Sequence, residues 1–183
     1  MMKFESCFLL VLLLCCTFAL AEEPIETQTD STGLYEYTLL ESGSAEIIRY
    51  RGKDQVLEIP AELDGHPVTS IGEKAFFYCS SLTAISIPDS VTSIGASAFY
   101  NCCSLTTISI PDSVSSIGEG TFAYCDSLST ISIPDSVTSI GKDAFANCEN
   151  LTLIVGRNSY AHTYAQENGL NFTYPDANDW LNS

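Results

Sequence analysis

The stretch LTTISIPDSVSSIGEGTFAYCDS, residues 105–127, decides the fold because the sequence repeats it without a gap. LTAISIPDSVTSIGASAFYNCCS precedes it at 82–104, and LSTISIPDSVTSIGKDAFANCEN follows at 128–150. A fourth unit enters earlier, with Ile59-Pro60 and then VTSIGEKAFFYCSS from Val68, and it contains five extra residues. Self-similarity at a fixed period of about 23 residues predicts a solenoid of stacked coils.

Equivalent apolar side chains occupy the same slot of each block, so stacking would place like on like. Leu105 would lie on Leu128, and Phe122 on Phe145. One block cannot bury these side chains alone, whereas stacked blocks share a continuous core with contacts between nearest neighbours. Full burial of such a side chain contributes about 1.5–3 kcal/mol. The repeat therefore predicts coils that are stable only as an array.

The pattern inside one block predicts two extended segments joined by turns. Residues 108–110 alternate apolar and polar, and Pro111, which has no N–H, closes that strand. A Pro-Asp-Ser turn leads to a second short extended stretch at residues 114–117. We expect Gly118 to mark a tight corner and residues 119–125 to form a single helical turn.

The pattern LxxIxIPxSVxxIGxxAFxxC resembles the BspA-like, or treponemal, class of leucine-rich repeats over residues 56–155, where we count four units. This resemblance implies an α/β leucine-rich-repeat solenoid that is mostly β, right-handed, with a parallel sheet on its concave side and short convex helical turns. It also implies a surface or secreted protein, because adhesion and host-protein binding are activities of some members.

The segments on either side of the repeats are expected to cover the ends of the array. Residues 33–60 contain two alternating stretches around a Ser-Gly-Ser turn and predict an N-terminal β cap, which would protect an exposed strand edge. Residues 22–32 read as a flexible linker. Residues 156–183 predict a C-terminal helix-strand cap and tail, with Ser159 capping the helix and Gly169 stopping it.

The leader and the charge indicate an exported protein. Residues 1–21 combine Lys3, an apolar run and Ala19-Leu20-Ala21, which is typical of a signal peptide. We therefore expect a secreted or cell-surface location and no membrane span in the mature chain. The formal net charge of −16 argues against nucleic acid as a partner, because affinity for phosphate backbones depends on Lys and Arg.

One cysteine recurs at the same slot of every unit, three residues after the phenylalanine. Stacked coils would place these cysteines about 5 Å apart, which disulfide geometry allows, and an exported protein meets oxidising conditions. Cysteine is also a small buried hydrophobe, and we favour a structural ladder of buried, unpaired thiols. Cys103 is a fifth thiol outside the ladder, which consists of Cys79, Cys102, Cys125 and Cys148.

Polar residues on the predicted strands are the candidate binding groups. Serines between inward isoleucines should point to the concave face and could contact a protein, a glycan or ice; the plain alternative is a soluble strand face. The concave-face candidates are Thr83, Ser86, Thr106, Ser109, Ser129 and Ser132.

We expect no catalytic site, no metal and no cofactor. A serine nucleophile needs a positioned base, and the two histidines, His66 and His162, read as surface residues. Asp89, Asp112 and Asp135 form a row that could attract calcium weakly, but turn chemistry explains them without an ion.

Two functions remain open from the sequence. The first is a protein-binding or adhesion module that uses its concave strand face and loops to contact host or other cell-surface proteins or glycans, weakly or multivalently. The second is a passive structural or immune-decoy surface protein with no dedicated ligand. The strand face spans roughly a few hundred Å², below the roughly 800 Å² per partner of a standard interface, which is why we expect weak contacts.

Overall fold

The computed structural model describes residues 26–175, which form a mostly β solenoid of about six turns with one helix. The predicted leucine-rich-repeat solenoid is therefore confirmed. The predicted signal peptide, residues 1–21, lies outside the described residues. Among residues 26–175 no helix is long and apolar enough to cross a bilayer.

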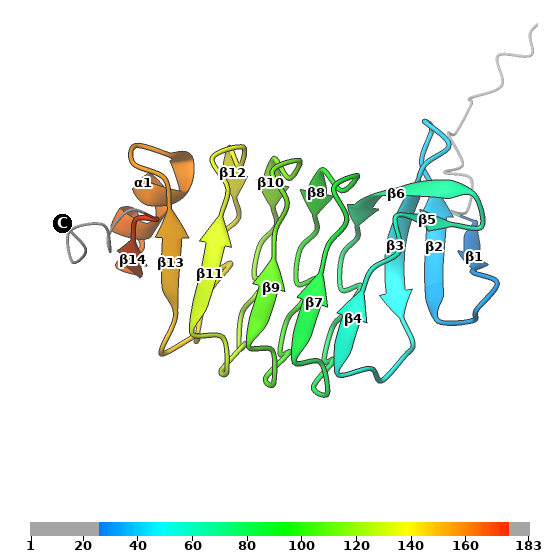
Figure 1. Cartoon of the computed structure of the whole chain (residues 1–183), viewed down its shortest axis with the longest axis horizontal. Coiled ribbons are helices and arrows are strands. Elements are labelled where there is room, and N and C mark those ends of the chain that lie inside the picture. Colours follow the sequence, from blue (N-terminus) through cyan, green and yellow to red (C-terminus); the bar gives the residue numbers. More distant parts are fainter. Residues whose placement is uncertain (1–25, 176–183) are drawn as a thin grey trace, which may run out of the picture.

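One wall of the solenoid carries the Ile-x-Ile strands and their equivalents, which lie side by side as two parallel sheets, β4-β7-β9 and β11-β13-β14 (Figure 1). The register is in step from coil to coil: Ile85 pairs with Ile108, and Ser86 with Ser109. We call this wall the strand face. Its strands are β4 (Val56–Glu58), β7 (Ala84–Ser86), β9 (Thr107–Ser109), β11 (Thr130–Ile133), β13 (Thr152–Val155) and β14 (Asn171–Thr173).

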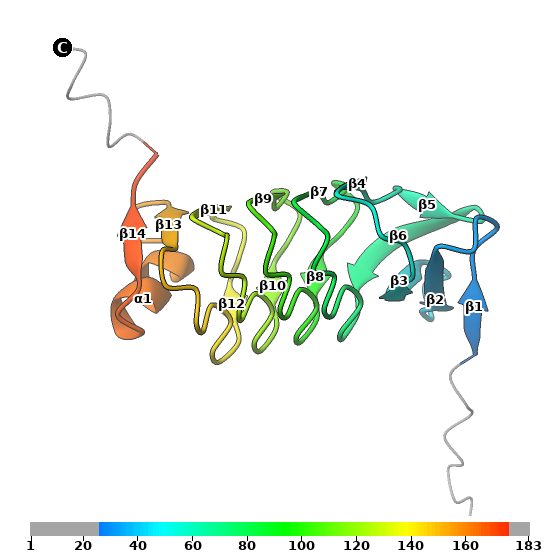
Figure 2. The same cartoon turned by 90° about the horizontal axis from the view of Figure 1, so that it is seen from below.

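The second predicted extended stretch forms another parallel wall (Figure 2). Each coil contributes a short strand whose isoleucine pairs with the same isoleucine of the next coil, as Ile94 does with Ile117 and Ile117 with Ile140. These strands are β6 (His66–Ile71), β8 (Ser93–Ile94), β10 (Ser116–Ile117) and β12 (Ser139–Ile140).

The core lies between the two walls and repeats with the coils. Phe99 and Phe122 have no exposed surface and stack with their ring centroids 5.4 Å apart and their planes 1° from parallel. Phe76 and Phe145 extend the stack with centroid distances of 5.1 and 5.6 Å. Buried leucines repeat in the same way, so each coil completes the core of its neighbour.

The segment between β10 and β11 is not the helical turn that its sequence suggested. The Phe122 N–H donates to Ala144 O of the next coil at 2.7 Å, and the Tyr124 N–H donates to Ala146 O at 2.9 Å. Those donors are thus unavailable for bonds along a helix, and Tyr124 has a φ of 61°, outside the right-handed helical region. The turn is instead bonded sideways to the following coil.

Gly118 is required for a different reason from the tight corner we expected. Its φ is not positive, but a Cβ atom there would lie 2.4 Å from Ala96 N and 2.6 Å from Gly95 C of the preceding coil. Gly141 is similar, with a Cβ 2.3 Å from Glu119 N. These glycines allow the backbones of successive coils to approach closely.

The N-terminal end is an antiparallel hairpin of β2 (Tyr35–Leu39) and β3 (Ala45–Tyr50), and β3 then pairs in parallel with β6. Part of the predicted linker is ordered, because β1 (Thr27–Thr29) pairs with β2. The prediction of a flexible linker over residues 22–32 is therefore wrong for residues 27–29, which form a strand with a ladder partner.

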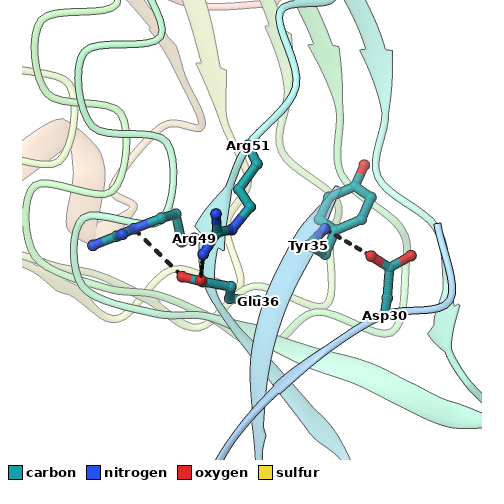
Figure 3. A network of polar contacts seen from close by, with 5 residues as sticks. All are labelled: Asp30, Tyr35, Glu36, Arg49 and Arg51. Atoms are coloured by element: carbon teal, nitrogen blue, oxygen red, sulfur yellow. Dashed lines mark hydrogen bonds and ion pairs between the residues drawn. The ribbon is translucent and has the colours of Figure 1, made fainter. Parts of the chain in front are cut away.

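Polar contacts hold this hairpin (Figure 3). Arg49 Nε lies 3.5 Å from Glu36 Oε2, and Arg51 donates to the other oxygen of the same carboxylate. The buried Asp30 accepts from the Tyr35 N–H at 2.8 Å. Burial opposes ionisation of Asp30, but hydrogen bonds from Thr32, Tyr35 and Leu34 outweigh it and lower the pKa of this carboxyl.

The five extra residues of the first unit form a small hairpin. Strand β5 (Glu62–Leu63) pairs antiparallel with the start of β6. Asp64 and Gly65 make the two-residue turn with φ values of 49° and 87°, the left-handed conformations that an Asp-Gly hairpin turn requires. His66 then contacts Gly43 O at 2.9 Å.

The C-terminal end carries α1 (Tyr160–Glu167), whose first turn is capped by the Ser159 side chain, which accepts from His162 N at 3.1 Å. Gly169 follows the helix with a φ of 64°. Ala161, Tyr164 and Ala165 are buried, and the Tyr164 hydroxyl donates to Gly141 O at 3.1 Å. Tyr160, at the start of the helix, is 45% exposed.

Candidate functional site

The predicted serines of the strand face lie in one outward row. Ser86, Ser109 and Ser132 are exposed, because the isoleucines on either side of each serine point into the core. Within residues 26–175 none of these three hydroxyls forms a hydrogen bond with another side chain or with the backbone. Their donors and acceptors are therefore available to solvent or to a partner.

The predicted threonines have a structural role instead. Thr83 Oγ1 donates to Gln55 O at 2.8 Å, and Thr106 Oγ1 donates to Thr83 O at 2.9 Å. Each hydroxyl thus bonds to the backbone of the coil before it. Ser129 is exposed at the same slot, and its carbonyl accepts from Thr152 N at 2.9 Å. This slot therefore joins successive coils, and the hydroxyls of Thr83 and Thr106 are already bonded within the protein.

Sequence reasoning missed the second outward row of the same strands. Thr107 and Thr130 are exposed, stand two residues before Ser109 and Ser132, and form no side-chain hydrogen bond within residues 26–175. Strict alternation along the strand would have found them, since residues i and i+2 share a face. The candidate site is thus a pair of Thr-x-Ser hydroxyl rows, flanked on β4 by Val56, which is 71% exposed.

The cysteine ladder satisfies backbone carbonyls between coils. The thiols of Cys102 and Cys125 lie 3.2 Å from the oxygens of Phe76 and Phe99, and Cys148 lies 3.0 Å from Phe122 O. All five cysteines among residues 26–175 are free thiols. Burial raises the pKa of Cys125 from 9.0 to about 12 and that of Cys102 still further, so these thiols stay neutral and unreactive.

This raised pKa predicts how stability depends on pH. The folded pKa of Cys125 exceeds its ordinary value, so its stabilising effect is complete below about pH 9 and is lost as pH rises toward 12. We expect the stability difference between wild type and Cys125→Ser to fall by about 1 kcal/mol between pH 8 and pH 10. Urea unfolding at both pH values measures it; a difference that does not change with pH would contradict the burial of this thiol.

The other polar residues considered from the sequence do not converge on a reaction centre. Within residues 26–175 no group of three or more His, Cys, Asp and Glu side chains is arranged to hold a metal ion. Asp112 lies in a turn that the Val114 N–H closes on Pro111 O at 3.1 Å. The imidazole of His162 contacts the Tyr174 hydroxyl at 3.1 Å through Nε2 and accepts from the Asn158 N–H at 3.3 Å through Nδ1, so neither ring nitrogen is paired with a serine hydroxyl.

Comparison with known proteins identifies the repeat. A model described as "BspA type Leucine rich repeat region" matches residues 57–168 in six copies. The chain belongs to the BspA-type leucine-rich repeat family. Six copies exceed the four units counted in the sequence, and the match continues past residue 155, to residue 168 of the predicted C-terminal cap.

Solved structures of leucine-rich repeat proteins resemble the chain. The Treponema pallidum leucine rich repeat protein is 30% identical, with 69% of this chain and 71% of that chain covered and a TM-score of 0.56. A Bacteroides capillosus leucine-rich repeat protein is 33% identical over 69% and 97%, with a TM-score of 0.60. A leucine rich cell surface protein from Faecalibacterium prausnitzii is 32% identical over 81% of this chain and 40% of its own, with a TM-score of 0.64. No curated protein matches the chain.

Proposed function

We propose that this BspA-type protein is a secreted or cell-surface binding module whose strand face contacts host or other cell-surface proteins. The observation that carries the proposal is the pair of Thr-x-Ser rows. Thr107, Ser109, Thr130 and Ser132 are exposed on neighbouring strands and form no intramolecular side-chain hydrogen bond, whereas many other hydroxyls of the repeats bond to the preceding coil. The likeness to a leucine rich cell surface protein supports the location.

The chemistry of the strand face favours weak, repeated contacts. Its outward residues are small and polar, so they offer hydrogen bonds but little apolar area to bury. Its area is roughly a few hundred Å², which is below that of a standard interface. Recognition should therefore be of low affinity unless several copies engage at once, since linked binding events raise avidity without new contacts.

Charge added to the strand face should weaken binding. Ser109→Glu with Ser132→Glu places two carboxylates on adjacent strands, where a partner would have to desolvate them. The protein is applied as the probe to an array of cell-surface proteins. We expect the affinity of capture to fall at least about tenfold, which corresponds to about 1.4 kcal/mol.

The matched control is Ser115→Glu with Thr138→Glu, which adds the same charge to the same two coils but at exposed positions next to the second wall. Capture should persist in that variant, and circular dichroism checks that both variants fold. Equal capture by the strand-face variant and wild type would overturn the proposal. If neither the wild-type protein nor the control variant bound to the array, the result would support the passive decoy role instead.

A further inference from the structure

Exposed and half-buried aromatic side chains line the turns of the first three coils. Phe77 and Tyr100 stack with centroids 5.1 Å apart, and Tyr124 lies 5.2 Å beyond Tyr100. Tyr78 contacts both Phe77 and Tyr100, and it is 57% exposed. We call Phe77, Tyr78, Tyr100 and Tyr124 the aromatic ridge. Each ring packs against a ring of its own or the neighbouring coil, stacked for Phe77 and Tyr100 and tilted for Tyr100 and Tyr124, so the ridge is a continuous row of ring contacts and not a set of separate surface residues.

The ridge stops at Tyr124 because the next coil has small residues in both aromatic slots. Ala146 follows Phe77, Tyr100 and Ala123 in the first slot, and Asn147 occupies the second. The missing ring leaves a cavity of about 420 Å³ beside Tyr124. We call it the ridge pocket; it is lined by Tyr124, Asp126, Asn147, Glu149 and Asn150.

The backbone of the aromatic ridge holds Tyr124 in an unfavourable conformation. Tyr78 and Tyr124 have φ values of 60° and 61°, and the equivalent residues of the other coils are Asn101 and Asn147 at 58°. Asparagine tolerates this left-handed conformation, whereas a bulky side chain adopts it rarely. Asparagine would therefore suit the turn better, and tyrosine supplies an aromatic surface that the turn itself does not need.

Two carboxylates distinguish the ridge pocket from the earlier coils. Asp126 and Glu149 occupy the slot after the ladder cysteine, where the first two coils have Ser80 and Cys103. Both side chains are exposed, and neither forms a salt bridge with any residue of the described range 26–175. The pocket thus combines two uncompensated negative charges with an aromatic ring, on a chain whose net charge is −16.

We propose that the ridge pocket binds the guanidinium group of an arginine from a partner protein. A guanidinium is planar, so it can stack on Tyr124 and take the place of the missing ring. Its fork of N–H groups can donate to Asp126 and Glu149, and charge-assisted bonds of this kind are the stronger ones. The side-chain oxygens of Asn147 and Asn150 can accept the remaining protons.

The charge of the site favours arginine over the two other ligand classes. A neutral sugar could also stack on a tyrosine, but it would leave both carboxylates without a counter-charge. A divalent cation would need more oxygen ligands than the two acidic side chains of the pocket, and no metal-holding group exists within residues 26–175. This inference rests on the proposed function, which makes the partner a protein. It adds that the partner presents an arginine side chain.

The test uses the whole chain and two short peptides. Acetyl-Gly-Arg-Gly-amide is the ligand, and the same peptide with citrulline, which keeps the shape but lacks the charge, is its matched comparison. We expect chemical-shift changes at residues of the ridge pocket on titration with the arginine peptide, and binding at least about tenfold weaker for citrulline, since bonds to charged groups are the stronger ones.

Matched protein variants locate the effect. Asp126→Asn with Glu149→Gln should weaken binding of the arginine peptide by at least about tenfold. Asp112→Asn with Asp135→Asn removes the same two charges from exposed turns and should leave the affinity within about twofold, because surface charges at a distance are screened. Tyr124→Ala should weaken binding, and Tyr124→Phe should retain it because the ring face is preserved.

Three results would overturn the proposal: equal binding of the citrulline peptide, equal weakening by the Asp112 and Asp135 control, or tighter binding of a neutral disaccharide than of the arginine peptide at the same residues. Failure here is distinguishable from failure of the strand face, because the peptide reports on the ridge pocket alone. The Ser109 and Ser132 variant should bind the peptide normally.

Discussion

Phe122→Ala is expected to destabilise the solenoid by about 3–5 kcal/mol, the range measured when a large aromatic core residue is truncated. Phe122 is fully buried and stacks on both sides, with ring centroids 5.4 Å from Phe99 and 5.6 Å from Phe145. Truncation removes both ring contacts and leaves a cavity in the middle of the array. The backbone cannot collapse around it, because the Phe122 N–H is bonded to Ala144 O.

Urea unfolding followed by circular dichroism measures this loss. The matched control is Phe77→Ala, which removes the same side chain from a 39% exposed position on the aromatic ridge. It should cost less than Phe122→Ala, because its two ring contacts, with Tyr78 and Tyr100, contribute about 0.5–1.5 kcal/mol each beyond buried area and no enclosed cavity is left. If the two substitutions destabilised the protein equally, the stacked column would not be its core.

Gly118→Ala should destabilise the protein by about 3 kcal/mol or more, although the added group is a single methyl. Such an atom would lie 2.4 Å from Ala96 N, which is backbone and cannot rotate away. The coils must separate to admit it, and this strains hydrogen bonds such as Gly118 N–H to Ile94 O at 2.8 Å. Overpacking of a close-packed interior typically costs about 1–3 kcal/mol, and a rigid backbone contact lies at the upper end or beyond.

Gly43→Ala is the control for Gly118→Ala, because nothing lies within 4 Å of a Cβ at Gly43. Its φ of 79° still disfavours alanine, so we expect a loss of about 1 kcal/mol there. Thermal unfolding of both variants gives the comparison. A Gly118 variant as stable as the Gly43 variant would show that coil spacing does not depend on this glycine.

The repeat period made the solenoid predictable, and alternation made part of the candidate site predictable. Leu105 and Phe122 recur at fixed slots, and a solenoid is the structure that buries every such slot with one kind of contact. Ser109 follows from alternation with its inward neighbours. The same alternation, applied two residues before Ser109, identifies Thr107.

Other features depend on geometry between coils, which a single block does not encode. The Thr106 hydroxyl bonds to Thr83 O because the stacked backbones bring that carbonyl within 2.9 Å, and period-2 reasoning says nothing about it. Gly118 looks like a turn residue until the neighbouring backbone is in place. The ridge pocket exists because coil four lacks a ring that coil three has, so it depends on a difference between repeats, and an averaged motif conceals it.

The bonds that join the coils recur every 23 residues along the repeats: Ser115 to Thr92 is followed by Thr138 to Ser115, and Cys102 to Phe76 by Cys125 to Phe99. An in-frame duplication of 23 codons within the repeats would therefore insert a coil whose upper and lower surfaces already fit its neighbours. Slippage during replication of the gene can therefore lengthen such a protein by one coil at a time, and no new kind of contact is required. A change of length that is not a multiple of 23 residues, in contrast, must be absorbed in a turn, as the five extra residues of the first unit are absorbed in the β5–β6 hairpin.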